Sequence, residues 1–155
     1  MKRRAFIQNT SLAGVGLALV SNANASNPME KKLKTNNPSV IPLAIATWNV
    51  PNAIKKAWET LSANGKALDA VEKGVMVEEA DENNQTVGKG GRPDRDGNVS
   101  LDACIMDESG NCGSVVYLQN ITHAVSVARK VMEETPHVMI AGKGAELFAV
   151  EKGFK

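Results

Sequence analysis

The sequence predicts a mixed α/β fold in which strands and helices pack in layers. Segments with the helical spacing of apolar residues alternate with apolar runs of strand length at 41–48, 99–107, 112–119 and 137–141. Aromatic residues make up only 4% of the chain although 43% is hydrophobic. The core must therefore be built from Val, Ile, Leu, Ala and Met, which suits layers of strands and helices.

Length and charge limit the class of protein. A chain of 155 residues with a formal net charge of +1 is typical of one globular domain. Because neither basic nor acidic residues are in excess, nothing predicts a nucleic-acid partner. No pattern predicts a cofactor.

Residues 1–25 are typical of an export signal. Arg3 and Arg4 precede a mild apolar run from Leu12 to Val20, and Ala23 and Ala25 supply small residues at the spacing of a cleavage site. The run is shorter than the roughly 20 residues of a membrane-spanning helix, so no stable span is expected after signal removal. The arginine pair favours twin-arginine export to the periplasm with a cut after Ala25, and an ordinary secretory signal or an uncleaved anchor remains the alternative.

The predicted elements begin after a flexible leader. Residues 26–40 are rich in Lys and Asn and have no apolar period, so the folded region is expected to be 41–155 and to open with a strand at 41–48. Pro51 can start a helix, whose inward stripe would include Trp58 as an ordinary core residue. A second helix from Ala67 to Glu79 would point Leu68, Val71 and Val75 inward.

A glycine-rich loop, residues 87–98, then leads into a predicted antiparallel hairpin. The turn DESGN at 107–111 would place Cys112 opposite Met106 and Cys104 opposite Ser114. Diagonal neighbours of this kind lie about 7–8 Å apart, beyond comfortable disulfide reach, so two free, buried cysteines are expected. A register shift of two residues would instead put the cysteines opposite each other.

The last predicted elements are a helix at 124–134, a short buried strand at 137–141 and a short helix at 145–151. The first helix would point Ala124, Val127, Ala128 and Val131 inward and end before Pro136. The full order is then β, α, α, β, β, α, β, α, with no internal repeat.

Polar motifs in the chain do not predict a metal or nucleotide site. Asp94, Asp96 and Asn98 lack the glycine and glutamate positions of a calcium loop and are expected to form turns by bonding to their own backbone. The lysines beside glycines lack the spacing of a phosphate loop. His123 and His137 are isolated and are expected to cap a helix or to pack as rings.

Six ordered segments carry a resemblance to a known family. They are TWN at 47–49, GKALDAVEKGV at 65–75, TVGKGGRPDRDG at 86–97, VSLDACIMDE at 99–108, VSVAR at 125–129 and VMEETPHVM at 131–139. In this order they resemble the front half of the glycosylasparaginases (aspartylglucosaminidases), over residues 43–155. The resemblance implies the α-chain-like part of an N-terminal nucleophile hydrolase, incomplete in this chain, whose full fold is an αββα sandwich.

The resemblance also implies roles for two residues. Trp48 would line the substrate pocket, whereas its spacing alone favours a core tryptophan. Thr86 occupies a position that is usually Ser in the family, and its hydroxyl would support the active site. Lys89 replaces a residue that is usually aromatic, which puts the packing there in doubt.

The implied activity is hydrolysis of the side-chain amide of N-acetylglucosaminyl asparagine to release aspartate. In the family the nucleophile is an N-terminal threonine exposed by self-cleavage, with its own α-amine as general base. This chain has no counterpart of that threonine, so no catalytic residue is assigned, the chain alone is expected to be inactive, and a separate nucleophile-bearing chain or segment is its expected partner. A plant-type asparaginase or isoaspartyl peptidase and a non-catalytic remnant or binding module remain the alternatives.

Overall fold

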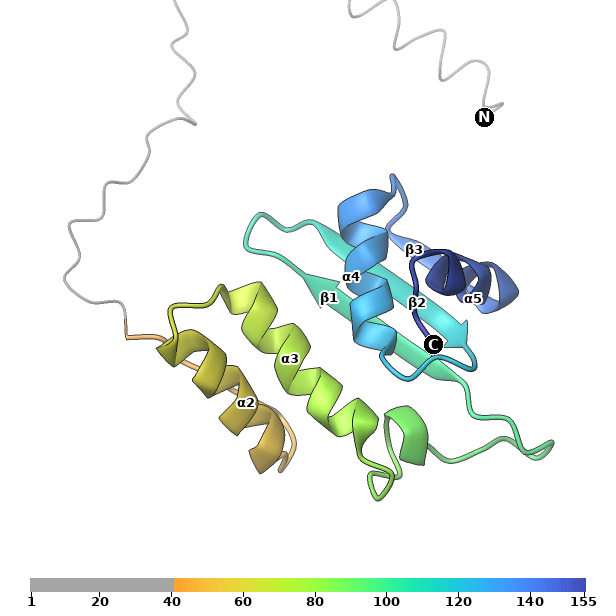
Figure 1. Ribbon diagram of the computed structural model, residues 1–155, viewed down its shortest axis with the longest axis horizontal. Helices are drawn as coiled ribbons and strands as arrows, with labels where there is room; N and C mark the ends of the chain where they lie inside the picture. The colour runs from red at the N-terminus through yellow and green to blue at the C-terminus, as the bar shows by residue number, and fades with distance from the viewer. Residues whose placement is uncertain (1–40) are drawn as a thin grey trace, which may run out of the picture. The chain divides into compact units, whose positions relative to one another are not determined.

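The computed structural model describes residues 41–155, so the predicted export signal at 1–25 and the predicted leader at 26–40 lie outside the described residues. In chain order the elements are α2 (Pro51–Ser62), α3 (Ala67–Ala80), the short 3-10 turn η2 (Gly88–Gly90), β1 (Leu101–Met106), β2 (Cys112–Leu118), α4 (Ala124–Glu134), β3 (Met139–Ala141) and α5 (Gly142–Glu151) (Figure 1). The mixed α/β class is confirmed. No helix of this described part is long and apolar enough to cross a membrane.

Within residues 41–155, three strands form one sheet in the order β1-β2-β3. β1 and β2 pair antiparallel, with Met106 opposite Cys112 and Cys104 opposite Ser114, so the predicted hairpin and its register are confirmed. β2 and β3 pair parallel, and α4 is the crossover between them. A parallel pair needs such a crossover because a tight turn reverses the chain direction, so that the two strands it joins can pair only antiparallel.

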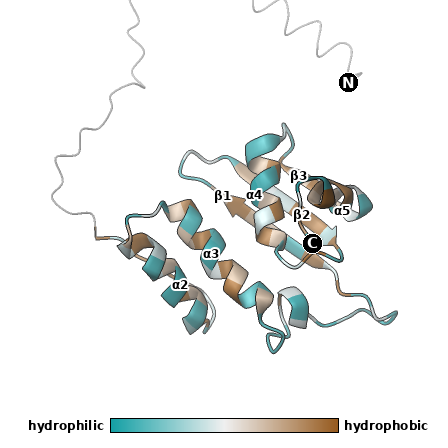
Figure 2. Ribbon diagram, viewed as in Figure 1, coloured by the Kyte–Doolittle hydropathy of each residue, from teal (hydrophilic) through white to brown (hydrophobic). Residues whose placement is uncertain are grey.

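One face of the sheet is covered by α4 and α5 (Figure 2). Val115 and Leu118 of β2 are fully buried there, together with Val127 and Val131 of α4. The predicted inward stripe of α4 is thus confirmed. Gly113 allows the close approach of strand and helix, because a Cβ at this position would overlap the backbone carbonyl of Ala128.

The opposite face of the sheet is open. Alternate residues of β1 point to this face, and Cys104 is exposed on it. Met106 and Met139 are also exposed, with exposed fractions of 66% and 56%. Both cysteines are free, as expected, but the expectation that they are buried is wrong, because Cys104 lies on this open face. The predicted burial of 137–141 is also wrong, because β3 is an edge strand and only Ile140 is half-buried.

The first two helices form as expected, but with a different contact surface. The buried residues at the α2–α3 contact are small: Ala57 of α2, and Ala70 and Gly74 of α3. A Cβ at Gly74 would lie 2.9 Å from the carbonyl of Ala53, so the two helices approach closely at this point. Small residues that bring two helices together leave larger side chains at the flanks. Trp58, Val71 and Val75 are accordingly exposed at 46%, 51% and 37%, so their predicted core positions are wrong.

The predicted strand at 41–48 is also wrong. This segment has no regular secondary structure, and Leu43 and Ile45 are exposed at 75% and 78%. An apolar run becomes a strand only when a neighbouring strand accepts its backbone hydrogen bonds. Among residues 41–155 the segment has no such neighbour. It runs beside α2 instead (Figure 1).

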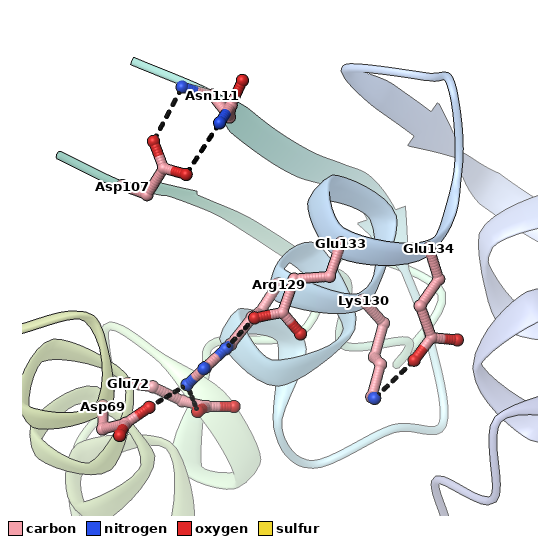
Figure 3. A network of polar contacts seen from close by, with 8 residues as sticks. All are labelled: Asp69, Glu72, Asp107, Asn111, Arg129, Lys130, Glu133 and Glu134. Carbon is pink, nitrogen blue, oxygen red and sulfur yellow. Dashed lines mark hydrogen bonds and ion pairs between the residues drawn. The ribbon is translucent and has the colours of Figure 1, made fainter. Parts of the chain in front are cut away.

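An ion-pair network joins α3 to α4 (Figure 3). Arg129 of α4 contacts Asp69 and Glu72 of α3, both at 2.7 Å, and Glu133 one turn along its own helix, also at 2.7 Å. Its side chain is only 20% exposed. Partial burial works against the charge, but the hydrogen bonds to the three carboxylates raise the pKa of Arg129 above its ordinary value.

Replacing Gly113 with Ala is expected to destabilise the chain. The added methyl group would overlap the backbone of α4 at Ala128 and Met132, and such overpacking costs about 1–3 kcal/mol of unfolding free energy. Urea denaturation followed by circular dichroism measures this loss. Gly144→Ala is the matched control, because nothing lies within 4 Å of its added Cβ. Equal stabilities for the two variants would contradict the close strand–helix contact.

Replacing Arg129 with Ala is expected to lower the unfolding free energy by about 1–3 kcal/mol, because three carboxylates lose their shared donor. The control is Lys130→Ala, which removes a single ion pair, with Glu134, that is more exposed than the Arg129 network. This substitution is expected to lower the unfolding free energy by less than about 1 kcal/mol. Both values come from the same denaturation experiment. A loss for Lys130→Ala as large as that for Arg129→Ala would refute the structural role of the network.

Candidate functional site

The glycine-rich loop starts with a close contact to α3. Gly88 has a φ of +63°, and a Cβ added there would overlap the backbone of Glu79. Only glycine combines this left-handed conformation with such a close approach. The loop is thereby fixed directly against the last turn of α3.

The outer part of the loop is held by its own polar residues. Asp94 Oδ1 accepts hydrogen bonds from the backbone N–H groups of Asp96 and Asn98, each at 2.9 Å. These bonds, led by that of Asn98, hold the pKa of the Asp94 carboxyl below its ordinary value. The interpretation of this stretch as a backbone-bonding turn is confirmed for Asp94. Within residues 41–155 no group of three or more His, Cys, Asp or Glu side chains could hold a metal ion.

Trp48 and Thr86 line the same cavity, although 38 positions separate them in the sequence. The cavity has a volume of about 700 Å³ and is bounded by residues 42–50, by α2 and α3, and by the start of the glycine-rich loop. Trp48 is 69% exposed, so the alternative of a core tryptophan does not hold. A turn bond from the N–H of Val50 to the carbonyl of Trp48, at 2.9 Å, places the ring just before α2.

Thr86 belongs to a short chain of hydrogen bonds at the polar part of this cavity. Its hydroxyl donates to Asn84 Oδ1 at 2.6 Å, and its backbone N–H donates to the same oxygen at 3.0 Å. Asn84 Nδ2 in turn donates to Glu78 Oε2 at 3.0 Å. Sequence reasoning missed both Asn84 and Glu78. For Asn84 the available signal was general: an Asn side chain often accepts a hydrogen bond from the backbone two residues on.

Lys89 lies outside the lining of the Trp48 cavity. It lines a second, more polar cavity of about 350 Å³ together with Asn98, Gln119 and Thr122. Lys89 therefore forms no part of the walls around Trp48.

The geometry supports binding and orientation of a ligand. Thr86 has a hydrogen-bonded hydroxyl, but its partner Asn84 is an amide, which is not a base. Among residues 41–155, no hydroxyl or thiol side chain is hydrogen-bonded to a histidine ring, and His137 is exposed. The cavity thus offers an aromatic face, an apolar wall and polar groups, without an activated nucleophile in the described part of the chain.

Comparison with known proteins places the chain in a family. The sequence profile of the asparaginase family (Asparaginase_2) matches residues 31–155. The chain is 50% identical to N(4)-(beta-N-acetylglucosaminyl)-L-asparaginase from Elizabethkingia miricola over 99% of its own length and 44% of the relative's. It is 46% identical to the Rattus norvegicus enzyme of the same name, over 79% of this chain and 35% of the relative.

The chain therefore spans less than half the length of the relatives to which it is similar. Their names agree with the resemblance that the TWN and glycine-loop segments indicate. A profile match over residues 31–155 and 50% identity over nearly the whole chain lead to one conclusion: the chain belongs to the asparaginase family.

Proposed function

We propose that the chain is the α-chain-like part of a glycosylasparaginase, a hydrolase that cleaves the side-chain amide of N-acetylglucosaminyl asparagine and releases aspartate. The observation that carries this proposal is the shared cavity of Trp48 and Thr86. An indole ring offers a flat apolar surface on which a sugar or an amide can stack. The names of the relatives support the substrate class.

The proposed role of this chain in the reaction is to bind and orient the substrate. Trp48 would form one wall of the pocket, and the Thr86 hydroxyl, held by Asn84, would face the reacting centre. The nucleophile would be an N-terminal threonine on a separate chain or segment. Its α-amine would take the hydroxyl proton as the hydroxyl oxygen attacks the side-chain amide carbonyl. The C–N bond would then break, and the N-acetylglucosaminyl amine would leave with that proton as the acyl-enzyme forms. Water would hydrolyse the acyl-enzyme, release aspartate and restore the threonine.

The open face of the sheet supports the proposal of a companion segment. Cys104, Met106 and Met139 expose apolar surface there, and β1 and β3 both lie at the sheet edges. Exposed edges and apolar faces of this kind are normally covered in stable proteins. We propose that the nucleophile-bearing segment supplies a second sheet on this face and so completes an αββα sandwich.

Trp48→Ala is expected to lower kcat/KM for N-acetylglucosaminyl asparagine by about tenfold or more, because the stacking surface is lost. The assay measures aspartate release after this chain is combined with the part of the Elizabethkingia miricola relative that it does not cover. Trp58→Ala is the matched control, since Trp58 is also an exposed tryptophan but does not line the cavity.

Each outcome of this assay decides between functions. No hydrolysis by the combined chains would favour a non-catalytic remnant or binding module. Faster hydrolysis of free asparagine or an isoaspartyl peptide than of the glycosylated substrate would favour the sister enzymes. Turnover by this chain alone would overturn the proposal that the nucleophile is supplied separately.

We also propose that residues 1–25 direct export to the periplasm by the twin-arginine route. Replacing Arg3 and Arg4 together with Lys is expected to leave the full-length chain inside the cell, because this route reads the arginine pair itself. Fractionation followed by mass spectrometry distinguishes the full chain from one cut after Ala25. Unchanged export of the double variant would point to an ordinary secretory signal instead.

A further inference from the structure

Glu79 is a buried carboxyl group at the junction of three elements. It lies in the last turn of α3 and is only 4% exposed. Its Oε1 accepts a hydrogen bond from the backbone N–H of Val125, in the first turn of α4, at 2.9 Å. His123 occupies the N-cap position of α4 but makes no capping hydrogen bond, so Glu79 supplies the cap from a different helix.

The second oxygen of Glu79 faces His123. Glu79 Oε2 and His123 Nδ1 lie 3.4 Å apart, and both atoms are buried without another hydrogen-bond partner. One proton between these two atoms satisfies both of them, whichever atom carries it, and leaving them unsatisfied would be costly. Burial, joined by the charge of Glu72, raises the pKa of Glu79 to about 7. Burial and the charge of Lys89 lower the pKa of His123.

We propose that Glu79 and His123 share a single proton and that this pair is the positioning element that seats the glycine-rich loop on α3 and α4. The link to the loop is direct, because the backbone of Gly88 packs against the backbone of Glu79. Thr86 lies two residues before Gly88, so the pair also sets where the Thr86 hydroxyl sits. Only this last consequence rests on the proposed function; the shared proton is a property of the folded chain.

The two groups make opposite contributions to the pH dependence of stability. Glu79 has a raised pKa, so its contribution is complete below the ordinary value of 4.5 and is lost as the pH rises through about 7. His123 has a lowered pKa, so its contribution is present above the ordinary value of 6.5 and is lost as the pH falls. Between pH 4.5 and pH 6.5 a rise in pH removes the stability that Glu79 contributes and restores the stability that His123 contributes. Above pH 6.5 only the loss of stability from Glu79 continues.

Cleavage of the loop by trypsin tests the proposal. Lys89 lies in the seated part of the loop, whereas Arg95, with a side chain 93% exposed, lies at its tip and serves as the internal reference. In the wild-type chain the ratio of cleavage at Lys89 to cleavage at Arg95 is expected to rise at least about threefold between about pH 6 and about pH 8, as the shared proton leaves. Mass spectrometry of the fragments measures both sites in one sample.

Glu79→Gln is the informative variant, because its amide carries a permanent N–H toward His123 while its oxygen can still accept the Val125 N–H. Its cleavage ratio is expected to stay low over the same pH range. Glu79→Ala is expected to give a high ratio at every pH, and Glu82→Gln, an exposed neighbour, should behave like wild type.

Two results would overturn the proposal: a wild-type ratio that does not change with pH, or a Glu79→Gln chain that is cleaved like Glu79→Ala. Neither depends on Glu79→Ala folding, because the wild-type pH series and the Gln variant each give an answer. Neither depends on hydrolysis of an amide substrate, so failure of the shared proton and failure of the proposed activity are distinguishable.

Discussion

The close packing of α4 on the β2 strand is the contact on which the rest of residues 41–155 depends. Gly113 brings the strand against the backbone of α4, and Val115 and Val127 are then buried without residual exposure. Because α5 returns to the same face, all of the covered apolar surface lies on one side of the sheet. The other side keeps Met106 and Met139 exposed, which gives a physical reason for a companion segment.

α4 also fixes the position of α3, and through it the candidate site. Arg129 joins the first half of α3 by ion pairs, and Glu79 joins the last turn of α3 to the start of α4. These two contacts hold α3 against α4 in the first half of α3 and in its last turn. Gly88 then places the glycine-rich loop against Glu79. The Thr86 hydroxyl reaches the cavity because α3 is held in this way.

Part of the candidate site could be predicted from the sequence. Trp48 and Thr86 were reached through the family segments that contain them, and Asp94 through turn chemistry alone. Asn84 and Glu78 were not, because a helix end followed by a polar stretch does not reveal which side chains bond to one another. The burial of Glu79 could not be predicted for a related reason. No local pattern distinguishes a buried carboxyl group from its exposed neighbours, and its partner Val125 is 46 residues away.

The sequence by itself determined what is local: the four helices within residues 41–155, and the DESGN turn with its favoured register of Cys104 opposite Ser114. These follow from periodicity and turn chemistry. The sequence also predicted the covered side of α4, but only the tertiary structure decided which other apolar surfaces are left uncovered. Residues 41–48 have strand-like composition but no strand beside them in the described part of the chain, and Trp58 has helical spacing but lies on a flank. The reason is that burial depends on a partner surface, and a pattern along one chain segment does not specify that partner.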